Sequence, residues 1–104
     1  MRSVMYESMD ELEASVRRRL YRLRDLGDEM AGVRARETAP DESMTVEVDG
    51  NGAIVDLQLS ESISRMTPEQ FESTLVTTSY AAARQAFAER ADLVNTFNDE
   101  VASW

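Results

Sequence analysis

Arginines are the residues of this 104-residue chain whose type and spacing could do chemistry. Five of them lie close together, at Arg17, Arg18, Arg19, Arg22 and Arg24. Planar guanidinium groups pair with phosphate oxygens, and such contacts give affinity without reading a base sequence. An ordinary solvated helix face is the alternative, because acids such as Glu13 and Asp25 lie three or four residues from an arginine, within ion-pairing reach. The residues alone leave both interpretations open.

The sequence offers little material for catalysis or metal binding. It contains no histidine and no cysteine, which removes the commonest general base, thiolate ligands and disulfides. The segment 47–58, EVDGNGAIVDLQ, has the spacing of a calcium-binding EF-hand loop. Its last position is Gln58 instead of a bidentate glutamate, and its flanks alternate as strands do. We interpret the segment as a hairpin turn, and we predict no enzymatic activity, no cofactor and no metal site.

Two more arginine positions are ambiguous, because Arg19 and Arg90 each interrupt an otherwise apolar helical stripe. An arginine at such a position can fix the register or the partner of a helix pair. Its long aliphatic stem can equally carry the charge past the stripe to water. The sequence favours neither interpretation.

A β-hairpin over residues 43–59 is the centre around which the other elements must be arranged. Apolar and polar residues alternate on both sides of the turn at 49–52, whose residues tolerate a positive φ. The first apolar row consists of Met44, Val46 and Val48, and the second of Ala53, Val55, Leu57 and Leu59. Ile54 is the one apolar residue expected on the outer side. One face of the sheet must therefore be covered by other elements.

Long helices are predicted on both sides of the hairpin. The first, at about 3–32, has an apolar stripe of heptad spacing, formed by Met5, Met9, Leu12, Val16, Leu23, Leu26 and Met30. The second, at about 67–103, begins at a capping box of Thr67 and Gln70, with Pro68 in the first helical position. Strands at about 33–38, 43–49 and 53–59 form an antiparallel meander. The prediction is one α+β domain over residues 1–104.

The second helix is expected to extend beyond its own domain. A helix of about 35 residues is ~52 Å long, whereas a 100-residue globule has a radius of gyration of about 13 Å. Its apolar stripe continues to the C-terminus, and a second copy of the chain is the economical partner for it. We predict a homodimer. The interface residues, which could alternatively contact another protein, are Val76, Tyr80, Phe87, Val94, Phe97, Val101 and Trp104.

The charge of the chain is unevenly distributed. The net charge is −9, but residues 1–36 hold eight arginines against seven acids, and residues 37–104 hold three against thirteen. An acidic chain does not favour non-specific binding to nucleic acid, so any such contact should use the first helix. No apolar run approaches the ~20 residues that cross a bilayer. We expect a cytoplasmic protein without membrane contact.

The order of long helix, three strands and long helix, with the segments APDESMTVEVDGNGAIVDLQL and SYAAARQAFA, resembles the YbaB/EbfC family of bacterial nucleoid-associated proteins. The resemblance covers nearly the whole chain and is to the actinobacterial branch. It implies a homodimer whose paired helices project like tweezers and bind double-stranded DNA in the nucleoid with little sequence preference. The DNA-binding residues that it implies here are Arg17, Arg18, Arg22, Arg34 and Arg36.

A second function stays open beside DNA binding. EspL-like relatives in the actinobacterial branch work through protein partners. The alternative is therefore a non-enzymatic interaction module or adaptor, for example one associated with type VII secretion. In it, the apolar end of the last helix would receive a helix of another protein. The resemblance favours DNA as the partner, and the net charge favours a protein.

Overall fold

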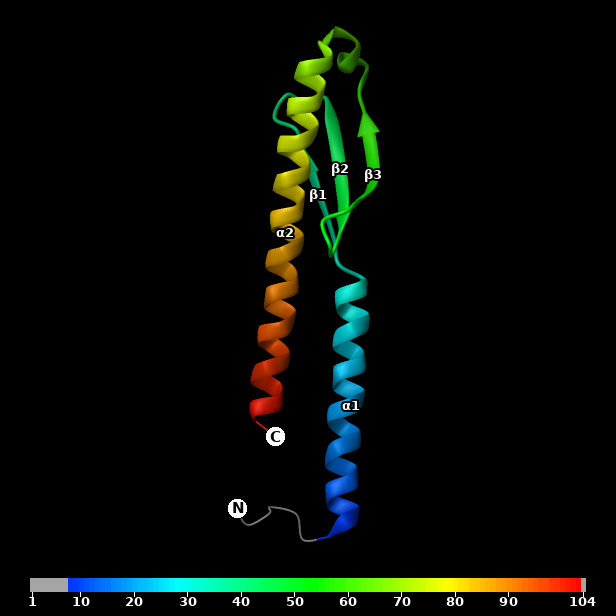
Figure 1. Cartoon of the computed structure of the whole chain (residues 1–104), viewed down its shortest axis with the longest axis vertical. Coiled ribbons are helices and arrows are strands. Elements are labelled where there is room, and N and C mark those ends of the chain that lie inside the picture. The colour runs from blue at the N-terminus through cyan, green and yellow to red at the C-terminus, as the bar shows by residue number, and fades with distance from the viewer. Residues whose placement is uncertain (1–7, 104) are drawn as a thin grey trace.

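The computed structural model describes residues 8–103 and shows an elongated α+β fold (Figure 1). The elements are α1 (Met9–Ala31), β1 (Arg34–Thr38), β2 (Met44–Asp49), β3 (Ile54–Leu59), the short 3-10 helix η1 (Glu61–Arg65) and α2 (Pro68–Ala102). The strands form one antiparallel sheet in the order β1-β2-β3. This arrangement confirms the predicted fold class.

Both long helices start at side-chain caps. The Ser8 hydroxyl accepts a hydrogen bond from the Glu11 amide at 3.2 Å, and α1 begins at Met9. The part of the predicted first helix that precedes Ser8, with Met5, lies outside the described residues. At α2 the predicted capping box is present, with the Gln70 amide donating to Thr67 Oγ1 at 3.1 Å and the Thr67 amide donating to Gln70 Oε1 at 2.9 Å. Such reciprocal bonds satisfy donors that a helix start leaves unpaired.

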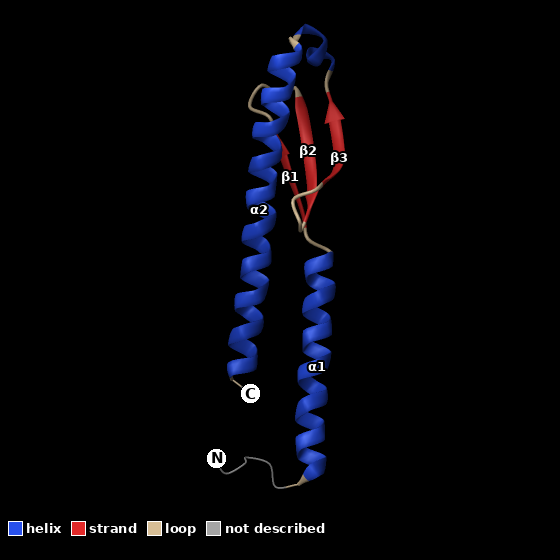
Figure 2. Cartoon of the chain, viewed as in Figure 1, coloured by secondary structure: helices blue, strands red, loops and turns tan. Residues whose placement is uncertain are grey.

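The molecule is a rod, as the length of α2 predicts. Its extents are 71 × 19 × 15 Å and its radius of gyration is 21.3 Å. The sheet lies near one end and α1 continues the rod at the other (Figure 2). The 35-residue α2 runs beside the sheet and then antiparallel to the C-terminal half of α1. No helix of the described part of the chain is long and apolar enough to cross a membrane.

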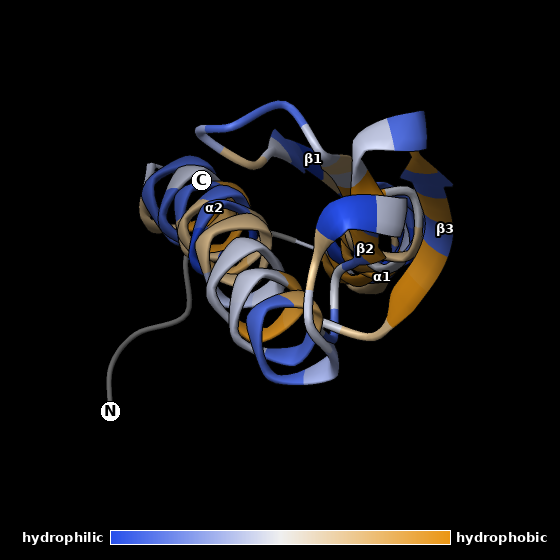
Figure 3. Cartoon of the chain, turned by 90° about the horizontal axis from the view of Figure 1, so that it is seen from above, coloured by the Kyte–Doolittle hydropathy of each residue, from blue (hydrophilic) through white to orange (hydrophobic). Residues whose placement is uncertain are grey.

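The core lies between α2 and the first two strands. Its buried residues come from β1, β2, their flanks and α2: Val33, Ala35, Ala39, Met44, Val46, Val48, Ala82 and Ala86. Alanines at the contact let the helix axis approach the sheet closely, and Phe71, Leu75 and Leu93 pack at the margins. Seen along the rod, α2 lies over β1 and β2, whereas β3 forms the edge of the sheet farthest from α2 (Figure 3).

The third strand departs from the predicted pattern, because all six residues of β3 are exposed. A bulge in the β2–β3 pairing shifts the register between Glu47 and Val48, so that Val48 pairs with Ile54. The extra residue of a bulge reverses the alternation of the residues that precede it. Ile54 therefore lies on the α2 side of the sheet, and the prediction that it is on the outer side is wrong.

The turn between β2 and β3 is closed by its own side chain. Asp49 Oδ1 accepts hydrogen bonds from the amides of Asn51 at 2.9 Å and Ala53 at 3.0 Å. The carboxylate that resembled a calcium ligand is thus used within the turn. Among residues 8–103, no group of three or more acidic side chains is arranged to hold a metal ion.

Gly52 gives the first testable prediction. Its φ is +82°, and an added Cβ would lie 3.0 Å from Phe87 Cζ and 3.4 Å from the Cβ of Ala83. We expect Gly52→Ala to lower the free energy of unfolding by about 1 kcal/mol or more, measured by urea denaturation. Gly27→Ala is the matched control, because that helical position is open within 4 Å and the change should stabilise by up to ~1 kcal/mol. Equal effects of the two substitutions would contradict this account of the turn.

Candidate functional site

The arginine-rich part of α1 is the candidate site. Residues 14–24 contain five arginines and no acid. The structure brings Arg17, Arg18 and Arg22 to one shallow hollow on α1 of about 440 Å³, which Ala14, Tyr21 and Asp25 complete. The N-terminal part of this helix projects past the end of α2 (Figure 1). The exposed residues of this segment, Arg17, Arg18 and Arg24 among them, are therefore accessible to a phosphate backbone.

The two exposed arginines of the hollow keep their charge near solvent. Arg17 Nη2 contacts Glu13 Oε1 at 2.8 Å, with 58% of the arginine side chain and 67% of the glutamate side chain exposed. Exposed ion pairs of this i,i+4 type contribute little to stability, so a phosphate can replace the carboxylate. Arg18 is exposed beside it.

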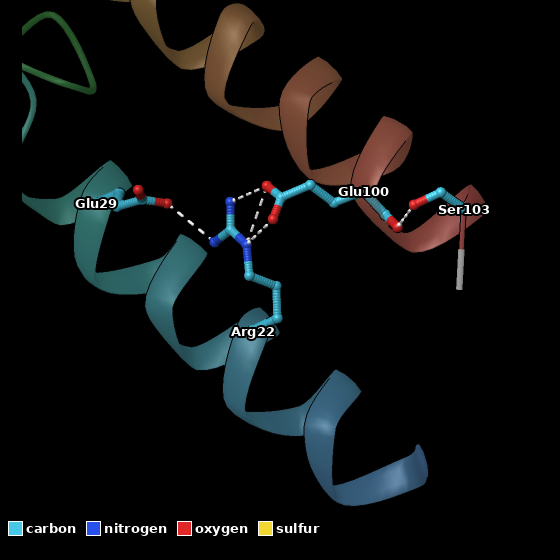
Figure 4. Close-up of polar contacts among 4 residues, drawn as sticks. All are labelled: Arg22, Glu29, Glu100 and Ser103. Carbon is cyan, nitrogen blue, oxygen red and sulfur yellow. Dashed lines mark hydrogen bonds and ion pairs between the residues drawn. The ribbon is translucent and has the colours of Figure 1, made fainter.

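Arg22 is bound to both helices (Figure 4). Its Nε lies 3.1 Å from each carboxylate oxygen of Glu100 on α2, and its Nη2 lies 2.7 Å from Oε1 of the same group. Nη1 donates to Glu29 on α1 at 3.1 Å, and the guanidinium lies 5.6 Å from the ring centroid of Phe97. Only 16% of the Arg22 side chain is exposed. We call Arg22, Glu29 and Glu100 the α1–α2 bridge.

Electrostatics within the α1–α2 bridge favour the charged forms. Hydrogen bonds from Arg22 lower the pKa of Glu100, and the attraction of the charges acts in the same direction, against partial desolvation. The hydrogen bonds that Arg22 donates to Glu100 and Glu29 raise the pKa of Arg22. The last turn of α2 has no basic residue of its own. Arg22 thus supplies the cation that a helix C-terminus favours.

The two sheet arginines of the prediction lie apart from the hollow. Arg34 Nη1 donates to the backbone carbonyls of Val33 at 2.7 Å and Ala31 at 3.2 Å. Arg36 Nη1 donates to Glu47 on β2 at 2.8 Å. Ala31 follows Arg18 by thirteen positions in α1, which places ~20 Å of helix between the two groups. The structure therefore does not gather all five predicted residues into one patch.

The two ambiguous arginines have different surroundings. Arg90 reaches the hairpin turn, where its Nη1 donates to the Gly50 carbonyl at 2.9 Å, so it fixes the turn against α2. Arg19 is half-buried, and its Nε is buried without a hydrogen-bond partner among the described residues. The sequence signals for these positions were identical, and only the tertiary fold distinguishes them.

An apolar groove of about 480 Å³ lies between β3 and α2. Ile54 lines it from the strand side and Val76, Tyr80 and Phe87 from the helix side. These three helix residues belong to the predicted interface, and they are 46%, 65% and 49% exposed. Further along α2, Val94 and Val101 are half-buried and Phe97 packs on Arg22. Trp104 lies outside the described residues.

The apolar stripe of α1 also faces solvent over much of its length. Met9, Leu12, Val16 and Leu23 are all exposed, and Leu20 adds to them. The covered side of α1 instead carries Ser15, Arg19, Arg22 and Leu26. At 3.6 residues per turn, this side lies about a quarter turn around the helix from the centre of the apolar stripe. The helix therefore packs along one margin of its predicted stripe and leaves the rest uncovered.

Acidification gives a test of the α1–α2 bridge. Because the folded-state pKa of Glu100 is lowered, the bridge stabilises the helix pair fully above the ordinary glutamate value of 4.5 and is lost as the pH falls below it. We expect the amide protection factors of the last turns of α2 to drop between about pH 6 and about pH 3. Glu100→Gln should show the low protection at both pH values. Asp99→Asn is the control, which leaves the α1–α2 bridge intact and should keep the wild-type loss of protection on acidification. A wild-type pH profile in Glu100→Gln would contradict the expectation.

The sequence and the fold are both similar to those of known proteins. The profile of the YbaB/EbfC DNA-binding family matches residues 5–100. No curated protein gives a significant match. Among solved structures, the uncharacterized protein HP0035 from Helicobacter pylori has a similar fold, with a TM-score of 0.66 at 15% identity, covering 88% of this chain and 97% of that one. The family match spans nearly the whole chain, and the chain belongs to the YbaB/EbfC DNA-binding family.

Proposed function

We propose that this chain forms a homodimeric nucleoid-associated protein that binds double-stranded DNA through arginines of α1, with little sequence preference. The family is a DNA-binding one, which supports DNA as the partner and a location in the nucleoid. The observation that carries the proposal is the run of five arginines without an acid at residues 14–24, on a helix that projects from the fold.

Arg17 and Arg18 are the strongest candidates for phosphate contacts. Both are exposed, and neighbouring guanidinium groups on one helix suit successive phosphate oxygens. Contacts of this kind set affinity and orientation but read no bases. The acids outside this segment give a net charge of −9 to the whole chain, so DNA should approach α1 and avoid the acidic remainder of the surface.

Arg34 and Arg36 extend the proposed DNA-binding set onto the sheet. Half of the Arg36 side chain is exposed despite its ion pair with Glu47. A duplex that lies along the rod could contact both groups, because the ~20 Å of helix between them corresponds to about 12 phosphate charges at ~1.7 Å per charge along the duplex axis. Arg22, the fifth residue of the set, is held in the α1–α2 bridge and is considered separately below.

The groove between β3 and α2 supports the homodimer. Exposed apolar surface that is continuous over two elements is typical of an interaction site, and Ile54, Val76, Tyr80 and Phe87 together form such a surface. A second copy of the chain presents the same surface, so a two-fold axis could bury both at once. The dimer would then carry two α1 helices and twice the number of arginines.

Salt dependence tests the DNA-binding proposal. We expect a labelled mixed-sequence duplex to bind, with log K falling against log salt by about 0.9 per phosphate contacted, as measured by fluorescence anisotropy. Arg17→Ala with Arg18→Ala should weaken binding to all sequences and reduce that slope by about 2, one for each lost contact.

The matched control removes two exposed arginines elsewhere, Arg65→Ala on η1 with Arg84→Ala on α2. It lowers the net charge equally and should change the slope little. An equal loss of DNA affinity in both double variants would mean that net charge, and not the position of Arg17 and Arg18, causes the loss. Absence of wild-type binding at low salt would overturn the proposal and point to a protein partner.

Mass in solution tests the homodimer. We expect twice the 11.7 kDa of one chain in light scattering, and a shift to monomer for Val76→Glu, because a charge at a buried apolar contact is unfavourable. Thr77→Glu is the control: it adds the same charge at the next residue, which is exposed and points about 100° away around the helix. A wild-type mass of one chain at micromolar concentration would refute the dimer.

A further inference from the structure

We infer that Arg22 is the positioning residue of the DNA-binding helix: the α1–α2 bridge fixes α1 against α2, and the phosphate contacts belong to Arg17 and Arg18. The inference rests on the proposed function, and it assigns Arg22 and Glu100 a role that neither the family match nor the sequence gives. It separates one arginine of the hollow from its two neighbours.

Each of the three guanidinium nitrogens of Arg22 already has a carboxylate partner. A guanidinium has five N–H donors in a fixed planar fork, and Nε, Nη1 and Nη2 of Arg22 all contact carboxylates at 2.7–3.1 Å. Phe97 covers one face of the group. A DNA phosphate that sought the paired Nε and Nη2 donors would have to compete with Glu100, which already accepts from both. Arg17, in contrast, has one exposed contact to replace.

Few side chains of α1 are buried in the part of the chain that the structure describes. The helix leaves the sheet at Gly32, its C-cap, which is followed directly by the buried Val33. Leu26 and Ser15 are the fully buried residues of α1 in the described part of the chain. Arg22 lies between these two along the helix and contacts the far end of α2. Loss of the α1–α2 bridge would leave the segment with Arg17 and Arg18 able to turn about Gly32.

The end of α2 depends on the same contact. Asp99 and Glu100 lie near its C-terminus, where negative charge is unfavourable, and the last turn has no basic residue. Arg22 is the cation that compensates both the carboxylate and the helix end. The α1–α2 bridge therefore orders both helices. Binding of DNA to a helix that is already ordered costs less conformational entropy than binding that must also order the helix.

The two roles of Arg22 predict opposite effects of Glu100→Gln. If Arg22 positions α1, the substitution makes the position of α1 less ordered. We then expect DNA affinity to fall on the order of 3- to 10-fold with an unchanged salt slope. If Arg22 is a phosphate contact that Glu100 restrains, the substitution frees it, and affinity rises. Asp99→Asn is the control, since it removes the same charge from the next residue and leaves the α1–α2 bridge intact.

A charge exchange completes the test. Arg22→Glu should weaken binding, and Arg22→Glu with Glu100→Arg should restore most of the affinity and the wild-type slope, because the ion pair forms again in the opposite sense. A double variant that stays weak, with a slope reduced by about 1, would overturn the inference and make Arg22 a phosphate contact.

Amide hydrogen exchange without DNA separates this inference from the proposed function. We expect fast exchange at the end of α2 in Arg22→Glu and recovery in the double variant. Normal protection in Arg22→Glu would overturn the positioning role even if DNA binds as proposed. If the wild type binds no DNA, the proposed function fails and the assignment of a DNA-positioning role fails with it, whereas the exchange data still decide whether the α1–α2 bridge holds the helices.

Discussion

One helix cannot cover a three-stranded sheet, and this constraint determines the rest of the structure. A helix with its side chains is about 10 Å wide, and strands lie ~4.8 Å apart, so α2 covers two strands and leaves the third. Its alanines, Ala82 and Ala86, bring it close to β1 and β2, which makes the core compact and β3 exposed. The other long helix does not cover the remaining strand, because it leaves the sheet at Gly32 and continues the rod. β3 is thus left uncovered because α2 is too narrow to cover it and α1 projects away from the sheet.

The fold could be predicted from the sequence because its signals are local. Alternation in the segment 43–59, the turn residues at 49–52 and the capping box of Thr67 and Gln70 each depend on neighbours within a few positions. They fix the element types and order without reference to tertiary contacts. The bulge opposite Val48 leaves no such signal, and the prediction for Ile54 was wrong for that reason. The residues of the predicted first helix that precede Ser8 lie outside the part of the chain that the structure describes.

The candidate site was only partly accessible to sequence reasoning. The arginine cluster is visible in the sequence, but which members are exposed is a matter of how α1 is rotated about its axis. The apolar spacing predicts a stripe centred on Val16 and Leu23, and both are exposed, because α1 contacts α2 along the adjacent margin that carries Arg22 and Leu26. Glu100 lies 78 residues from Arg22 in the chain. No pattern in the sequence links residues at that separation, so the partner of Arg22 had to come from the fold.

The continuity of α2 has a mechanical consequence. The helix runs for 35 residues, and no glycine or proline follows Pro68 in the sequence, so it lacks the usual causes of a kink. The groove residue Tyr80 and the bridge residue Glu100 lie on the same stiff element, ~30 Å apart at 1.5 Å per residue. A rigid helix transmits a tilt at one end to the other as a lever does. One continuous helix therefore fixes the separation between the groove and the α1–α2 bridge.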